Sequence, residues 1–301
     1  MALKHLSELN ERALALKPHR RAVVVASHDA HILQAVAMAK KDELIDPVLV
    51  GHVDETKKIL AELGESEDGY EFIEADTDED CAVTAIKLVQ DKKVDIIIKG
   101  IIETPTLMRQ VVKKENNVLT GLVSACGIFE SEKYHKVYAM TDMGINQFPT
   151  LEKKAQIIQN AVNFLTKLGI ENPKVAVLSS TERVNPKQQD TVEAAELKAM
   201  NERGEITGCI VEGPISLDLA LMAESAKTKG YSSPVAGDAD LLMVPDIVSG
   251  NLLVKGIGIF GGPKSMDAVL CCVVPIVFGS RGGPIEAKYN SIVLAAITAG
   301  E

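Results

Sequence analysis

The residues best suited to chemistry lie in a glycine-rich turn near the end of the chain, Gly279-Ser280-Arg281-Gly282-Gly283-Pro284. The apolar run at residues 273–278 predicts a short buried strand before the turn, and Pro284 suits the first turn of a helix after it. Such a turn directs backbone N–H groups and the positive end of a helix dipole toward one point. Arg281 is a cation at that positive end, which is unfavourable unless an anion shares the site. The turn therefore predicts a phosphate cradle, although an ordinary glycine turn with a solvent-facing arginine fits the same residues equally well.

Composition restricts the classes of protein to consider. The chain has 301 residues, a formal net charge of −10 and no Trp, so it lacks the basic stripe and stacking aromatics that nucleic-acid binding uses. The cysteines show neither metal-ligand spacing nor a disulfide framework, which predicts reduced thiols. Residues 1–17 predict an amphipathic helix and not a signal peptide, and no stretch is long and apolar enough to span a membrane. We therefore expect a cytoplasmic α/β protein with no nucleic-acid or membrane partner.

The elements that position the turn alternate along the chain. Apolar runs predict strands at residues 21–26, 46–50, 70–74, 94–98, 174–179 and 208–212, and helical spacing predicts helices between them. This alternation is typical of parallel sheets with helices on their faces. Between 121 and 140 the pattern changes to two neighbouring strands joined by a charged turn. We place a domain crossing near Phe148.

Ligands of open parallel sheets bind beyond the carboxyl ends of the strands. The residues that follow predicted strands are Ser27-His28-Asp29, Lys99-Gly100, Thr141-Asp142, Ser179-Ser180, Glu212-Gly213-Pro214 and Ser280-Arg281. With Arg109 in the helix after Lys99, they include one lysine, two arginines and several hydroxyls, a set typical of a phosphate site. The alternative is that Lys99 and Arg109 are solvated surface charges. No histidine has a partner at metal-ligand spacing, so we expect no metal.

Several separated motifs occur in one order along the chain. They are 174–179, 184–187, 193–195, Gly213-Pro214 with Asp218, 233–240, Pro245-Asp246-Ile247 with Gly250-Asn251, Ser280-Arg281 with Asn290-Ser291, Lys99-Gly100 with Thr106 and Arg109, and Asp142 with Asn146 and Pro149. Together they resemble the phosphate acetyl/butyryltransferase family, and most closely its butyryl-transferring members. The likeness runs from about residue 20 to the end and is densest after Lys174.

The resemblance implies a two-domain αβα fold with parallel and mixed sheets, of the isocitrate/isopropylmalate dehydrogenase kind, and an active site in the interdomain cleft. Domain I would comprise residues 1–148 plus 280–301, and domain II residues 149–279. Such enzymes interconvert acyl-CoA plus phosphate with acyl phosphate plus free coenzyme A. They need no metal or nicotinamide cofactor, since coenzyme A is a substrate, and they assemble as homodimers or higher homo-oligomers.

The resemblance also suggests a role for each motif. Arg281 and Arg109 would hold the phosphate, Ser280 would donate to the developing oxyanion, and the Gly282 and Gly283 amides would complete the cradle. Further phosphate or coenzyme A contacts would come from Lys99, Gly100, Thr106, Asn146, Gly237, Asp238, Asp246 and Asn251. Asp246 also fits a simple helix N-cap, which is the stronger of its two interpretations.

The general base is less well defined. Family members carry an acid shortly after the serine. At a spacing of six from Ser280 it is Glu286, and at seven the position is Ala287 and the acid is missing. Glu286 also suits a helix first turn, where a carboxylate complements the dipole. Asp142 is the second candidate.

Three alternatives stay open at this point. The first is a phosphate acetyltransferase of the same family. The second is an NAD-dependent decarboxylating dehydrogenase of the same fold, for which Asp238, Asp240 and Asp246 would have to form a metal site. The third is a non-catalytic subunit that binds coenzyme A.

Overall fold

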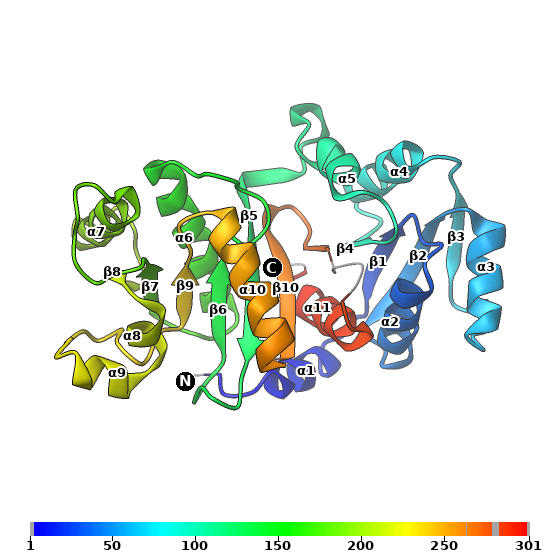
Figure 1. Cartoon of the computed structure of the whole chain (residues 1–301). Helices are drawn as coiled ribbons and strands as arrows, with labels where there is room; N and C mark the ends of the chain where they lie inside the picture. Colours follow the sequence, from blue (N-terminus) through cyan, green and yellow to red (C-terminus); the bar gives the residue numbers. More distant parts are fainter. Residues whose placement is uncertain (1–2, 263, 279–282, 300–301) are drawn as a thin grey trace. The chain divides into compact units, whose positions relative to one another are not determined.

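The computed structural model describes residues 3–262, 264–278 and 283–299 (Figure 1). The chain divides into two compact units. Unit A comprises Ser7–Gly121 and Ser265–Glu301, and unit B comprises Met1–Leu6 and Leu122–Lys264. The predicted domain boundaries lie at 148 and 279 instead, so residues 1–6, 122–148 and 265–279 are grouped differently.

Unit A contains a sheet whose strands lie in the order β3, β2, β1, β4, β11, β10. Their bounds are β1 (Arg20–Val25), β2 (Ile45–Gly51), β3 (Glu71–Glu74), β4 (Ile96–Lys99), β10 (Lys264–Cys272) and β11 (Ile276–Val277). Neighbours from β3 to β11 are parallel, whereas β10 and β11 are antiparallel. The chain order reverses between β1 and β4, and ligands of open α/β sheets bind beyond the strand ends at such a point.

The helices of unit A cover this sheet (Figure 1). They are α1 (Ser7–Leu14), α2 (Ala30–Lys41), α3 (Val53–Glu62), α4 (Asp78–Gln90), α5 (Thr104–Val111) and α11 (Ile285–Thr298), with a 3-10 turn at Lys114–Asn116. Because crossovers between parallel strands are right-handed, α2 and α3 lie on one face and α4 lies on the other. The last helix, α11, packs on α2. The central strands are therefore covered on both faces, and Val23, Val24 and Val25 are fully buried.

Unit B has a second run of strands, in the order β5, β6, β9, β7, β8. They are β5 (Leu119–Glu130), which begins in unit A, β6 (Tyr138–Thr141), β7 (Lys174–Leu178), β8 (Ile210–Ile215) and β9 (Leu241–Met243). As the sequence predicts, the first two strands are neighbours joined by the charged turn, and the structure shows that they pair antiparallel. The remaining neighbours are parallel.

Two groups of helices pack on these strands. They are α6 (Leu151–Lys167) and α7 (Gln189–Glu202), and then α8 (Leu217–Leu221), α9 (Ala223–Thr228) and α10 (Ile247–Gly261). Met140 of β6, Leu242 of β9 and Leu178 of β7 belong to one hydrophobic cluster with α8 and α9, and α10 packs against its edge. Successive strand residues point to opposite faces, so α6 contacts β6 and β9 from the other side.

The structure corrects several sequence-based element bounds. Glu212-Gly213-Pro214 lies inside β8 and does not follow it, so these residues leave the set of strand-end candidates. The predicted strand 273–278 is reduced to β11, because the chain turns after β10, a strand that the sequence analysis does not predict. A single predicted helix at 216–229 is interrupted at Met222, which separates α8 from α9. Among the described residues, no helix is both long and apolar enough to cross a membrane.

A carboxyl group in β10 makes the stability of the chain depend on pH. Burial raises the pKa of Asp267 from an ordinary 3.8 to about 6. The unfolded chain therefore ionises this group first, and folding stability falls as pH rises from about 4 to about 6. We expect Asp267→Asn to add about 1–3 kcal/mol to the free energy of unfolding at neutral pH, and almost nothing near pH 4. Urea unfolding of both proteins at the two pH values measures this, and an equal effect at both would contradict it.

Candidate active site

The carboxyl edge of the unit A sheet brings together segments that are distant in sequence. β4 pairs in parallel with β1 on one side and with β11 on the other, so all three strands end at the same edge. The Gly100 amide donates to Val25 O at 2.9 Å, and the Ile101 amide donates to Ala26 O at 3.0 Å. A Cβ atom at Gly100 would lie 2.1 Å from Ala26 O, so only glycine fits there. The end of β1, at Val25 and Ala26, therefore lies beside Gly100 and Ile101 at the end of β4.

Lys99 is buried at the end of β4. Its Nζ donates to Gly100 O at 3.1 Å and to Ile102 O at 2.8 Å. The ammonium group therefore holds the loop that leads into α5, and it adds a buried cation to this edge of the sheet. The interpretation of Lys99 as a solvated surface charge is wrong.

Lys288 is a second buried cation, and it is absent from the candidates predicted from the sequence. It lies in the first turns of α11, and its Nζ donates to Gly283 O at 2.9 Å. Burial lowers the pKa of Lys288, while the nearby Asp29 carboxylate opposes that change. One signal was available in the sequence. Lys288 precedes the buried Ile292 by four residues, which places it on the apolar face of the predicted helix.

Arg109 and Thr106 of α5 are in contact. The Arg109 Nη2 atom donates to Thr106 Oγ1 at 3.2 Å, and the guanidinium group is exposed. The helix begins five residues after β4 ends, with Pro105 in its first turn. An exposed guanidinium fixed at one nitrogen keeps its other donors available for an anion.

Part of the predicted cradle lies outside the described residues, namely Ser280, Arg281 and Gly282. Their predicted roles stay predictions. Gly283 is described and accepts the Lys288 hydrogen bond through its carbonyl oxygen. Glu286 lies in the first turn of α11 and is exposed, so its carboxylate is accessible to a substrate.

Asp142 and Asn146 form a closed loop motif at the carboxyl end of β6. The buried Asp142 carboxylate accepts from the backbone amides of Gly144, Ile145 and Asn146 at 3.0–3.1 Å, and from Asn146 Nδ2 at 2.6 Å. Asn146 Nδ2 also donates to Val123 O at 2.8 Å. Both Asp142 oxygens thus hold their own loop, which favours a structural role for this residue over that of a base.

Of three further candidates in unit B, two have structural explanations. Asp246 is the N-cap of α10, where its Oδ1 accepts from the Ser249 amide at 2.8 Å, so the N-cap interpretation is confirmed. Gly237 has φ +70°, and a Cβ atom there would lie 2.5 Å from Ala223 Cα. Asn251 is exposed on α10.

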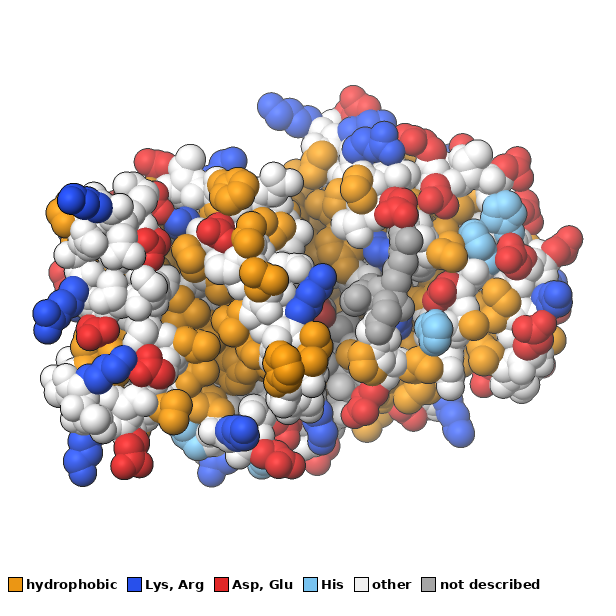
Figure 2. Space-filling model, in the orientation of Figure 1, with side chains coloured by type: hydrophobic (Ala, Val, Ile, Leu, Met, Phe, Trp, Pro, Cys, Tyr) orange, Lys and Arg blue, Asp and Glu red, His pale blue; other side chains and the backbone are white. Residues whose placement is uncertain are grey.

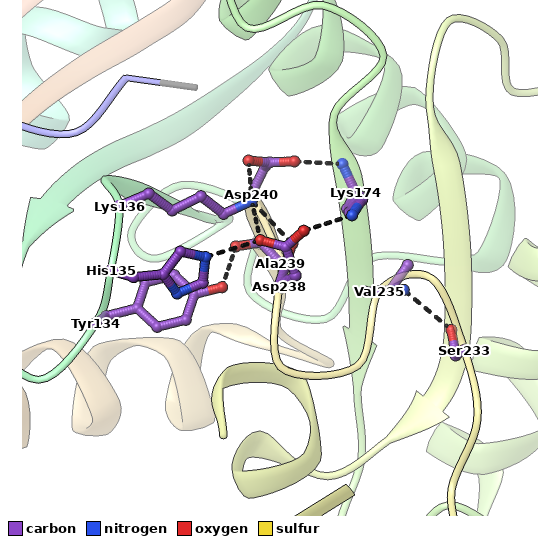
Figure 3. Close-up of polar contacts among 9 residues, drawn as sticks. All are labelled: Tyr134, His135, Lys136, Lys174, Ser233, Val235, Asp238, Ala239 and Asp240. Atoms are coloured by element: carbon purple, nitrogen blue, oxygen red, sulfur yellow. Dashed lines mark hydrogen bonds and ion pairs between the residues drawn. The ribbon is translucent and has the colours of Figure 1, made fainter. Parts of the chain in front are cut away.

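Asp238 lies in a charged cluster before β9, at the amino edge of the unit B strands (Figure 3). Its Oδ1 lies 2.8 Å from Lys136 Nζ and 2.9 Å from His135 Nε2, and its other oxygen pairs with Lys174. Burial opposes ionisation of Asp238, but hydrogen bonds from Lys136, Lys174 and His135 outweigh it and hold the pKa of this carboxyl below its usual range. Thr141-Asp142 lies at the opposite edge of the same strands.

Asp240 completes this cluster. Its Oδ1 lies 2.6 Å from Lys136 Nζ, and its Oδ2 accepts from the Lys174 amide at 2.8 Å. The carboxylates of Asp238 and Asp240 are thus neutralised by lysines, and Asp246 caps a helix, which does not fit the metal site that a decarboxylating dehydrogenase would need. Throughout the part of the chain that the structure describes, no group of three or more His, Cys, Asp or Glu side chains is arranged to hold a metal ion.

The adjacent thiols at the end of β10 are poor nucleophiles. Burial raises the pKa of Cys271, and it raises the pKa of Cys272 to about 12. Both groups therefore stay protonated at neutral pH, and a thiol needs its thiolate form to react.

Comparison with known families shows the family of this chain. Residues 68–296 match the family described as "Phosphate acetyl/butaryl transferase". The chain belongs to this family. The match includes β4, α5 and most of α11, and therefore every described candidate of the carboxyl edge of unit A except Ser27 and its neighbours.

Individual members of the phosphate acetyl/butyryltransferase family are similar over nearly the full chain. A phosphate butyryltransferase from Clostridium acetobutylicum is 37% identical over 285 residues, which cover 94% of this chain and 95% of that protein. A phosphate acetyltransferase from Thermotoga maritima is 37% identical over 281 residues, which cover 93% of this chain and 95% of that protein. The crystal structure of a branched-chain phosphotransacylase from Enterococcus faecalis superposes with a TM-score of 0.84 at 30% identity, and covers 93% of this chain and 99% of that one.

Proposed function

We propose that this protein transfers a short acyl group, butyryl, between coenzyme A and inorganic phosphate. It would interconvert acyl-CoA plus phosphate with acyl phosphate plus free coenzyme A. The observation that carries the proposal is family membership over residues 68–296, together with near full-length similarity to a phosphate butyryltransferase. The buried cations at the carboxyl edge of unit A support it, because a phosphate substrate needs such groups. The proposal includes an isocitrate/isopropylmalate dehydrogenase-like arrangement with the active site in an interdomain cleft.

The proposed reaction needs two kinds of group. In the direction that consumes acyl phosphate, the coenzyme A thiol loses its proton and the sulfur attacks the carbonyl carbon. The new C–S bond forms, and the bond between the carbonyl carbon and the oxygen that bridges to phosphorus breaks. Phosphate then leaves with the electron pair of that bond. Negative charge therefore develops on the carbonyl oxygen and on the departing phosphate. The protein must supply a base for the thiol and donors for these oxygens.

Within this proposal, Arg281 and Arg109 bind the phosphate and Ser280 donates to the developing oxyanion. The Gly282 and Gly283 amides complete the cradle. Lys99 and Lys288 contribute positive charge to this edge of the sheet, because the ammonium group of each donates a hydrogen bond to a backbone carbonyl of a loop there. They act by raising the local positive potential without direct contact with the reacting atoms.

Glu286 is the proposed acceptor of the thiol proton. Glu286→Gln keeps the shape of the side chain and removes its basicity, so we expect kcat to fall about 10²–10⁴-fold and the acid limb of the pH–rate profile to flatten. Thiol consumption with butyryl phosphate and coenzyme A measures both effects. The matched control is Glu62→Gln, an exposed carboxylate on α3. If Glu286→Gln retains full activity across pH, Glu286 is not the base.

Acyl preference separates this proposal from the second candidate, a phosphate acetyltransferase. The Thermotoga maritima acetyltransferase is as identical to this chain as the Clostridium acetobutylicum butyryltransferase. One added methylene in an apolar pocket changes binding by only about 1–3 kcal/mol. The decisive experiment measures phosphate-dependent thiol release from acetyl-, propionyl-, butyryl- and branched acyl-CoA. A kcat/KM for acetyl-CoA above that for butyryl-CoA would favour the acetyltransferase.

The same assay tests the alternatives from other classes. A non-catalytic subunit that binds coenzyme A would release no thiol with any acyl-CoA. A dehydrogenase would change nicotinamide absorbance without phosphate, and its activity would be lost with a chelator. We expect thiol release that requires phosphate and survives a chelator.

A further inference from the structure

A pocket of about 640 Å³ lies in unit A, at the edge of the sheet opposite the candidate active site. It is bounded by the end of α4, the start of β4, the segment after the 3-10 turn and the segment before β11. Because β4 and β11 are parallel, both start at the amino edge of the sheet. Asp95 lines the pocket and precedes Gly100 by five residues, which in a strand span roughly 16 Å. None of the described lining residues takes part in the proposed mechanism.

The pocket has an apolar wall. Five valines from four segments of unit A line it, namely Val89, Val94, Val118, Val273 and Val274. Backbone hydrogen bonds fix this wall, since the Val273 amide donates to Val118 O at 2.9 Å and the Ile97 amide donates to Pro275 O at 3.0 Å. Pockets of this size, lined by apolar side chains and a few polar groups, are typical of small-molecule sites. A ligand that fits this wall therefore carries an aliphatic group.

Carboxamide side chains at the rim hold the pocket in shape. Gln90 Nε2 donates to Asn116 O at 3.0 Å, and Asn116 Nδ2 donates to Gln110 O at 2.7 Å. These bonds join the end of α4 to the 3-10 turn. The rim is thus ordered before a ligand binds, which lowers the entropy lost on binding.

Two opposite charges line the pocket without neutralising each other. Lys92 makes no ion pair within the part of the chain that the structure describes, although the adjacent Lys93 pairs with Asp91 at 3.6 Å. Asp95 also makes no ion pair with any described residue, and its Oδ2 accepts from the Arg21 amide at 2.8 Å. The last turn of α4 adds the negative end of a helix dipole, which favours a cation. The pocket therefore offers one positive and one negative partner beside an apolar wall.

This combination restricts the class of ligand. A polyphosphate needs several cations, and Lys92 is the only lysine or arginine among the described lining residues. A monocarboxylate would leave Asp95 without a cation, and an amine would leave Lys92 without an anion. Figure 2 shows acidic and basic side chains interspersed over unit A, so the visible surface does not attract a highly charged ligand either. A zwitterion with an apolar side chain satisfies every group.

We propose that this pocket binds a free α-amino acid with an aliphatic side chain. The carboxylate of the ligand pairs with Lys92, its ammonium group with Asp95 and the end of α4, and its side chain packs on the valines. Both charges of the ligand are thus paired where water is partly excluded. This inference does not depend on the proposed acyl transfer.

The first test is isothermal titration calorimetry of the full chain with L-leucine, which is expected to bind saturably at one site per chain. Three analogues each lack one recognised group. 4-Methylpentanoate lacks the ammonium group, 3-methylbutylamine lacks the carboxylate, and glycine lacks the side chain. Each should bind about tenfold more weakly or worse. A lack of saturable binding by L-leucine at millimolar concentrations, or equal binding by any analogue, would overturn the proposal.

The second test assigns each charge to its partner. Lys92→Ala should weaken binding of L-leucine about tenfold without weakening 3-methylbutylamine, which has no carboxylate. The matched control is Lys93→Ala, which should keep the parent affinity because Lys93 does not line the pocket. Asp95→Asn keeps an acceptor for the Arg21 amide and should weaken L-leucine but not 4-methylpentanoate. Parent affinity in both Lys92→Ala and Asp95→Asn would refute this assignment.

The third test places the ligand in this pocket. Val273→Asp puts a charge into the apolar wall and should abolish binding of L-leucine. Val83→Asp is the matched control, because Val83 is 48% exposed and Val273 49%, and Val83 lies on α4 outside the pocket. Circular dichroism checks that both variants fold. Arg109→Ala, at the candidate active site, should keep the parent affinity. Binding that survives Val273→Asp, or that is lost in Arg109→Ala, would place L-leucine elsewhere and overturn the proposal.

Discussion

Replacing Arg109 by alanine is expected to raise the KM for phosphate and to lower kcat, with a combined loss of about 10²–10³-fold in kcat/KM. The guanidinium group is exposed and its one described partner is Thr106 Oγ1, so the substitution should leave the fold intact. Removing a donor that contacts the leaving phosphate weakens the transition state more than the ground state, which is why kcat falls as well. Steady-state kinetics with varied phosphate at saturating butyryl-CoA measures both constants.

Two controls make this result specific. Arg109→Lys keeps the charge but loses the planar fork that binds two phosphate oxygens, so it should recover only part of the activity. Lys113→Ala removes an exposed cation close to Arg109 in sequence, and its kinetics should match those of the parent. A similar loss in Lys113→Ala would mean that overall charge, and not a specific contact, is responsible. We expect Arg281→Ala to behave like Arg109→Ala, and unchanged kinetics in both variants would remove the phosphate-binding hypothesis.

Residues at the ends of strands and at the starts of helices could be predicted from the local sequence. Lys99 and Gly100 follow an apolar run, and the rule that ligands bind beyond carboxyl ends placed them correctly beside the end of β1. Asp246 before an apolar helix gave a recognisable N-cap. In each case the local sequence determines the local structure, so no knowledge of distant contacts was needed.

Other features depend on contacts that a local pattern does not contain. Asp238 and Asp240 precede β9, and Lys174 begins β7, so these residues meet at the amino edge of the sheet. Asp238 precedes a strand whereas Asp142 follows one. Had residues before strands been considered too, the two would have been placed at opposite edges of the sheet. Gly213 is another case: it lies inside β8, where a Cβ atom would lie 2.8 Å from Val177 Cβ, and a local pattern does not contain that long-range contact.

The largest expected effect on stability comes from Lys136. Its buried ammonium group lies 2.6 Å from Asp240 Oδ1 and 2.8 Å from Asp238 Oδ1, and it also donates to Asp238 O at 2.9 Å. Lys136→Met retains most of the side-chain volume but leaves the Asp240 carboxylate buried without this cation. We expect a loss of about 3–5 kcal/mol in the free energy of unfolding at neutral pH. Lys133→Met, an exposed lysine on the same turn, is the matched control and should change stability by less than about 0.5 kcal/mol.

The dependence on pH identifies the cause of that loss. The pKa of Asp238 is held low in the folded chain, so its contribution to stability is present above the unfolded pKa of about 4 and is lost as pH falls below it. Lys136→Met removes one of the cations that lower this pKa. The difference in the free energy of unfolding between variant and parent should therefore become smaller near pH 3. Adding Asp240→Asn to Lys136→Met should recover part of the loss, because the unpaired carboxylate is then gone. If this difference in the free energy of unfolding does not change with pH, or if the double variant is no more stable than Lys136→Met, then packing of the lysine stem, and not its charge, stabilises this charged cluster of unit B.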